Sequence, residues 1–208
     1  MKLLVLALAL TACGGSQVPQ IFHDDWCLSP QAGTEDLPDG WQDSVRAGSD
    51  VWHEAGLPQI DLRDSCPWPL TVEDLGPGVL GRARASFLFG TRISGWVKFD
   101  DLARWMRTSV ADCGGEEHRL LTNLASHELG HFAGVSFPDN SDDTAHNDRG
   151  VMSRYIHPLC DVIEPRPEEI DRMKRAVKSW KGYDNPSLTI TIDTTLYDDG
   201  TCEHEVEQ

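Results

Sequence analysis

The sequence is poor in positive charge. It contains 18 Lys and Arg residues against 34 Asp and Glu, which gives a formal net charge of −16 at pH 7. A surface of this sign repels nucleic-acid phosphates and anionic lipid headgroups, so we expect neither as a partner. Such acidity is compatible with bound Ca²⁺, although by itself it indicates only a solvated surface.

Long apolar runs are also missing, except at the N-terminus. A lysine at position 2 precedes the run Leu3–Leu10, which is too short to span a bilayer and is typical of a secretion signal. The stretch Leu10-Thr11-Ala12-Cys13 resembles a bacterial lipobox, in which cleavage precedes a cysteine that receives a lipid. We therefore predict a signal peptide over residues 1–12, lipidation of Cys13 and a location in the cell envelope, lipid-anchored at the outer membrane or cell surface. An ordinary signal peptide with a chance cysteine is the alternative.

The cysteines lack the close spacing of a cysteine zinc cluster. The chain has six, and the five beyond the lipobox form no CxxC pair: Cys27, Cys66, Cys113, Cys160 and Cys202. In an exported protein, disulfide bonds are the better interpretation. An odd number leaves one cysteine unpaired, and the spacing leaves the connectivity open.

The chain shows no internal repeat, and the roughly 195 residues left after cleavage suit one domain. Residues 13–38 are rich in Gly, Pro, Ser and Gln and are predicted to be a tether. Residues 39–182 would form the main domain. Residues 183–208 would be a C-terminal extension, in which a strand over 188–192 and a turn at 198–200 favour a hairpin.

Hydrophobic spacing predicts both helices and strands in the main domain. Helices are expected from Trp41 to Ala55, ended by Gly56, and from Leu120 to Phe132. Short strands are expected around 60–62, 86–90 and 93–99, and a short helix after Asp100-Asp101. Residues 136–150 are polar and predict a loop. Pro167 should begin a last helix that reaches Trp180. The fold class predicted from these elements is α+β.

The stretch His127-Glu128-Leu129-Gly130-His131 carries the strongest chemical signal. Two imidazoles four residues apart on a helix lie on one face and can bind one metal ion. Catalytic zinc typically has three protein ligands and a water molecule, which zinc acidifies. Glu128 follows the first histidine directly and is the expected general base. The motif can also arise by chance in a helix.

Together with Gly134 and the stretch Gly150-Val151-Met152-Ser153, this motif resembles the metzincins, most closely the matrixin-like branch. The resemblance covers roughly residues 40–180. It implies a zincin-like domain with a twisted mixed sheet, an active-site helix and a small, loop-rich lower subdomain. It also implies a turn that places Met152 beneath the zinc ligands.

The chain departs from the metzincin pattern at the third zinc ligand. The expected position is Phe137, which cannot bind zinc. His146, in a loop enlarged by nine residues (146 minus 137), is the replacement we predict. Asp139 is the alternative, and the absence of any third protein ligand is a further one.

The resemblance also extends upstream of the motif. Residues 76–81 and 93–101 are similar to the segment that precedes the active-site helix in matrixins, where a strand at the sheet edge holds the peptide substrate. Lys98 stands where one histidine of the matrixins' second zinc site would be, so that site is not expected. The loop aspartates 139, 142, 143 and 148 are expected to belong to a solvated loop, because they lack EF-hand spacing, and a Ca²⁺ site is the alternative.

We therefore predict a monomeric, lipid-anchored zinc metalloendopeptidase that acts on proteins or peptides. Its metal ligands would be His127, His131 and His146, and its general base Glu128. One alternative is a binding lipoprotein that keeps the fold without catalysis, because of Phe137. Another is a structural or adhesion protein whose motif is accidental.

Overall fold

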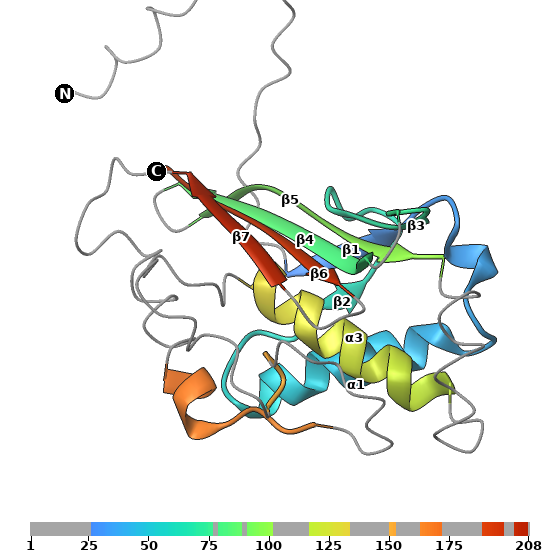
Figure 1. The fold of residues 1–208 in the computed structure, drawn as a ribbon, viewed down its shortest axis with the longest axis horizontal. Coiled ribbons are helices and arrows are strands. Elements are labelled where there is room, and N and C mark those ends of the chain that lie inside the picture. Colours follow the sequence, from blue (N-terminus) through green and yellow to red (C-terminus); the bar gives the residue numbers. More distant parts are fainter. Residues whose placement is uncertain are drawn as a thin grey trace, which may run out of the picture.

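The structure is a computed structural model. It describes residues 26–76, 79–88, 91–101, 117–133, 150–152, 163–171, 189–197 and 202–207. In these ranges the chain forms one sheet of seven strands, and its two long helices lie together on one side of that sheet (Figure 1). The predicted α+β class with a mixed sheet is therefore confirmed.

The strand order across the sheet is β2-β1-β3-β5-β4-β6-β7. Strand β1 pairs in parallel with β2 and β3, and β3 pairs in parallel with β5; the pairs β5–β4, β4–β6 and β6–β7 are antiparallel. The strands are β1 Cys27–Pro30, β2 Asp61–Leu62, β3 Pro69–Glu73, β4 Val79–Leu88, β5 Thr91–Asp100, β6 Thr189–Tyr197 and β7 Cys202–Glu207.

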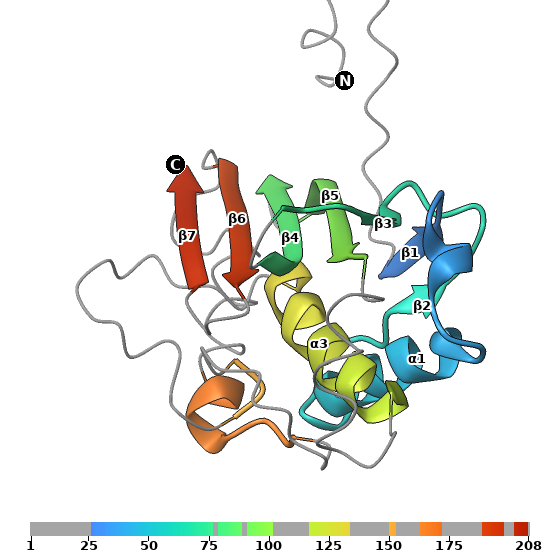
Figure 2. The ribbon, with the colours of Figure 1, turned by 45° about the vertical axis from the view of Figure 1, so that its right-hand side comes forward.

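Two helices agree with the predicted hydrophobic spacing. Helix α1 spans Trp41–Glu54, and helix α3 spans Glu117–Phe132. Helix α3 crosses beneath β4 and β5, while α1 packs against α3 (Figure 2). The two helices approach closely at Gly48, where a Cβ atom would lie 2.8 Å from the backbone nitrogen of Ser126. A side chain at position 48 would push the helices apart.

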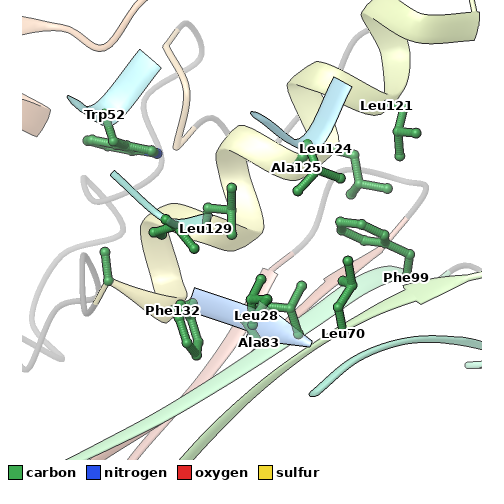
Figure 3. Close-up of a cluster of buried hydrophobic side chains, with 14 of the residues drawn as sticks. Leu28, Trp52, Leu70, Ala83, Phe99, Leu121, Leu124, Ala125, Leu129 and Phe132 are labelled. Atoms are coloured by element: carbon green, nitrogen blue, oxygen red, sulfur yellow. The ribbon is translucent and has the colours of Figure 1, made fainter. Parts of the chain in front are cut away.

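The core lies between α3, α1 and the sheet. Leu28, Leu70 and Phe99 point from the strands towards Leu124 and Leu129 of α3 (Figure 3). All five side chains are fully buried. Burial of a leucine or phenylalanine side chain contributes about 2 kcal/mol, so this layer fixes α3 against the sheet.

The predicted tether extends too far along the chain. Residues 27–30 form β1 inside the sheet, and Thr34–Asp36 form a 3-10 helix, η1. Cys27 is bonded to Cys66 by a disulfide with Cα atoms 5.9 Å apart, which ties β1 to the segment before β3. The folded domain therefore already includes residues 27–36, and the predicted boundary at residue 38 is wrong.

The C-terminal extension forms the predicted hairpin, but it is not separate from the domain. Strand β6 pairs along β4 from Val79↔Tyr197 to Leu88↔Thr189, and β7 pairs with the other side of β6. Since β5 also lies between two strands, neither β4 nor β5 has an open edge. The edge of β4, where the resemblance leads us to expect a peptide substrate, is therefore occupied by β6 in the described sheet.

Several predicted features lie outside the described residues. These are the signal peptide, Cys13, the short helix after Asp101, the loop over 136–149, and the part of the last helix beyond Asp171. The described part of that helix begins at Pro167 as predicted. Within the described ranges, every helix is too short or too polar to cross a lipid bilayer.

Candidate metal centre

The side chains of the predicted motif lie in the middle of the protein, on the part of helix α3 in which every residue from Leu120 onwards is buried. His127 and Glu128 are fully buried, and His131 is 1% exposed. Arg92 of β5 holds the C-terminal end of this helix, because its guanidinium donates a hydrogen bond to the carbonyl of Phe132 at 2.8 Å. Burial of three ionisable side chains on one helix face is costly unless they bind something or pair with one another.

His127 and His131 converge as the spacing predicts. Their Nε2 atoms are 3.0 Å apart, and their rings meet edge to face. Two nitrogen ligands of a tetrahedral zinc ion, each about 2.0–2.1 Å from it, lie about 3.3 Å apart. The observed separation is close to that value, so these two residues fit one zinc ion.

A backbone contact fixes the orientation of the first imidazole. Nδ1 of His127 donates a hydrogen bond to the carbonyl of Val151 at 3.0 Å. The lone pair of the ring is then on Nε2, the nitrogen that faces His131. Metal-binding histidines usually donate their other ring N–H in this way, which fixes the tautomer and strengthens the ligand.

The predicted methionine turn lies directly against the helix. Met152 is fully buried, and its sulfur would be 2.6 Å from a Cβ atom at Gly130, between the two histidines. Gly150 begins the turn with φ of 130°, a conformation that L side chains rarely adopt. Position 130 thus needs glycine for the sulfur, and position 150 needs it for the turn.

Glu169 holds this turn in place. Its carboxylate accepts hydrogen bonds from the backbone N–H groups of Met152 at 2.7 Å, Val151 at 3.3 Å and Arg166 at 2.6 Å. Burial raises its pKa, while these hydrogen bonds act in the opposite direction. The contacts therefore run from Glu169 through the Val151 backbone to the imidazole of His127.

Glu128 lies under the start of strand β4. A Cβ atom at Gly81 would be 2.5 Å from Oε1 of Glu128, so the glycine makes room for the carboxylate. Among the described residues neither carboxylate oxygen has a hydrogen-bond partner. Burial therefore raises the pKa of Glu128 well above its ordinary value. A zinc ion nearby would lower it, since a cation favours the carboxylate form.

The other residues of the predicted site lie outside the described residues. These are His146 and its alternative Asp139, together with Phe137 and Gly134. In the part of the chain that is described, no group of three or more His, Cys, Asp or Glu side chains is arranged to hold a metal ion. Two ligands of the expected set are thus positioned, and the third is not.

Other polar residues have structural partners. The Nδ1 atom of His53 binds the carbonyl of Leu57, and that of His118 lies 3.1 Å from the hydroxyl of Ser44. Lys98, at the position of the matrixins' second zinc site, forms an ion pair with a glutamate of β3. These three side chains therefore have partners within the fold.

Sequence reasoning missed two residues of the site. Gly81 was part of a matrixin-like segment, but nothing local to it indicates contact with Glu128. Glu169 lies in the first turn of the helix predicted to begin at Pro167, and that position indicates a helix start and no contact with the site. The one available signal is an acidic residue in the segment that follows the expected methionine turn.

No protein-family model matches this sequence, and no curated protein is significantly similar to it.

Proposed function

We propose that the chain is a zinc-dependent metalloendopeptidase with a metzincin-like fold, and that it is anchored to the cell envelope by a lipid on Cys13. The observation that carries the proposal is the convergence of the two Nε2 atoms of His127 and His131, 3.0 Å apart. The Val151 hydrogen bond and the buried sulfur of Met152 support the same assignment. A chance motif in a helix would not be expected to show these contacts.

The third ligand is assigned to His146, with Asp139 as the alternative. When bound, zinc supplies a Lewis acid and lowers the pKa of water towards about 7. His127 and His131 would hold it through Nε2, and Val151 would keep the first imidazole in the correct tautomer.

Glu128 supplies the proton transfers. Its carboxylate would take a proton from the water molecule that attacks the scissile carbonyl carbon. The same proton would then pass to the leaving nitrogen, so that a carboxylic acid and an amine are formed as the C–N bond breaks. The fully buried position of Glu128 keeps bulk water from competing for this proton.

The proposal is tested with a peptide library and purified protein. We expect hydrolysis that is blocked by a chelator and restored by one equivalent of zinc. Stoichiometric zinc without hydrolysis would instead support a binding lipoprotein with this fold. Protein purified without zinc, and inactive when zinc is added, would support a structural protein with an accidental motif.

A further inference from the structure

The C-terminal hairpin occupies the edge of β4 beside Glu128. Strand β6 runs antiparallel to β4 along its whole length, and Gly81, which lies against the Glu128 carboxylate, is paired with Leu196. Helix α3 itself reaches β6. Figure 2 shows the hairpin, in red, as a continuation of the sheet next to β4.

An edge strand can pair with one neighbour at a time on a given side. A peptide that adds to a sheet edge uses the backbone N–H and C=O groups of that edge, and those of β4 are used by β6. Among the described strands, β7 is the last at this end of the sheet, and its outer side lies two strands farther from Glu128. Adjacent strands are about 4.8 Å apart, so a peptide on β7 would lie about 10 Å farther from the carboxylate.

The sequence of β6 makes it a strong competitor. Its nine residues, Thr189–Tyr197, are mostly threonine and isoleucine, which are β-branched residues that favour extended structure. Because β6 belongs to the same chain, its effective concentration at β4 is of the order of 1 mM. A free peptide of equal intrinsic affinity at about 100 µM would then occupy about a tenth of the sites.

We infer that the C-terminal hairpin is an autoinhibitory segment, and that β6 must leave β4 before an extended peptide can pair beside Glu128. This inference rests on the proposed function, because it takes the edge of β4 as the place where substrate lies. The partner that competes for this edge is an extended polypeptide with a free backbone.

A reversible disulfide bond between β4 and β6, here called the lock, tests the inference in the full-length protein. Arg82 and Thr195 are paired neighbours on β4 and β6, and Arg82 lies on the opposite face of β4 from Gly81. The double variant R82C/T195C should form a disulfide that holds β6 on β4 without entering the site. In the control T195C/E203C, the same residue is linked instead to its partner on β7, which leaves β6 free to move from β4.

The probe is a fluorescein-labelled peptide with the sequence of residues 189–197, measured by fluorescence anisotropy. For R82C/T195C we expect binding in the millimolar range when reduced, and binding at least about tenfold weaker when oxidised. The control should bind equally in both states. Equal binding by oxidised and reduced R82C/T195C, or binding by neither, would overturn the inference.

Casein hydrolysis, measured on the same samples, separates this inference from the proposed function. If both are correct, oxidation slows hydrolysis in R82C/T195C and not in the control. If peptide binding depends on the lock while no sample hydrolyses casein, the hairpin controls the edge of β4 and the proposed protease activity is wrong.

Discussion

A methyl group at position 81 should displace the general base without touching a metal ligand. In Gly81→Ala the new Cβ would lie 2.5 Å from Oε1 and 2.9 Å from Cγ of Glu128, whereas ordinary contacts begin at 3.4 Å. The carboxylate would therefore have to move by about 0.9 Å (3.4 minus 2.5). The tightly packed surroundings of this fully buried side chain allow little adjustment.

A misplacement of about 1 Å in a catalytic group costs about 100-fold in rate. We therefore expect kcat for peptide hydrolysis to fall by about that factor in Gly81→Ala. The zinc content should remain at one equivalent, because the three atoms nearest to a Cβ atom at position 81 all belong to Glu128. Initial rates on a peptide library and atomic absorption of the purified protein measure the two quantities.

Ala83→Gly is the matched control, since it lies two residues along β4 on the same buried face. It should lose about 0.5–1 kcal/mol of stability through backbone entropy, plus a small packing loss, and keep its kcat. If Gly81→Ala retained kcat within about threefold of the wild type, the placement of Glu128 beneath β4 would be refuted.

Three further predictions concern the same site. With a chelator present, burial raises the pKa of Glu128 above its ordinary value of 4.5, so the side chain stays protonated in the folded protein at a pH where it ionises in the unfolded chain. The free energy of unfolding of the wild type should therefore fall relative to that of Glu128→Gln as the pH rises from 4.5 to the folded pKa. The expected slope is about 1.4 kcal/mol per pH unit. Urea unfolding at several pH values measures the difference in free energy between the two proteins. A difference that stays constant across that range would contradict the prediction. In the control Glu54→Gln, on the exposed face of α1, the free energy of unfolding should change with pH as it does in the wild type. Glu169→Gln replaces one accepting oxygen with an amide donor, so we expect it to lose about 1–3 kcal/mol of stability. In a competition titration it should also bind zinc about tenfold more weakly. Unchanged zinc affinity would show that the methionine turn does not influence metal binding. His146→Ala should weaken zinc binding more than about tenfold and Asp139→Asn should not; the reverse pattern would make Asp139 the third ligand.

Helices and the local motif were the parts that could be predicted. The spacing of Trp41, Val45 and Trp52 gave α1 its start and its buried face, because helical periodicity depends only on neighbours in the sequence. The convergence of His127 and His131 follows from the same geometry, since residues four apart lie on one helix face.

Strands β1 and β3 could not be predicted because their sequences are short and each has a proline at one end. Strand β1 ends at Pro30, and β3 begins at Pro69. Each is held by parallel neighbours distant in the sequence. Composition favoured a tether for residues 13–38, and long-range pairing together with the disulfide of Cys27 outweighed that local tendency.

Contacts between distant segments explain the remaining differences. The C-terminal hairpin was predicted from its own sequence, but its pairing with β4 depends on a match between two strands about a hundred residues apart. The approach of Gly81 to Glu128 is also a contact between distant parts of the sequence. The same holds for the hydrogen bonds between Glu169 and the methionine turn. Hydrophobic periodicity carries no information about such partners.

The central claim is that Glu128 performs proton transfer beside a zinc ion held by His127 and His131. The most direct measurement compares casein hydrolysis by the wild type and by Glu128→Gln, each carrying one equivalent of zinc. We predict hydrolysis by the wild type and a loss of at least about 100-fold in the variant. Equal hydrolysis by the two proteins, or none by the zinc-loaded wild type, would contradict proton transfer by Glu128 beside zinc.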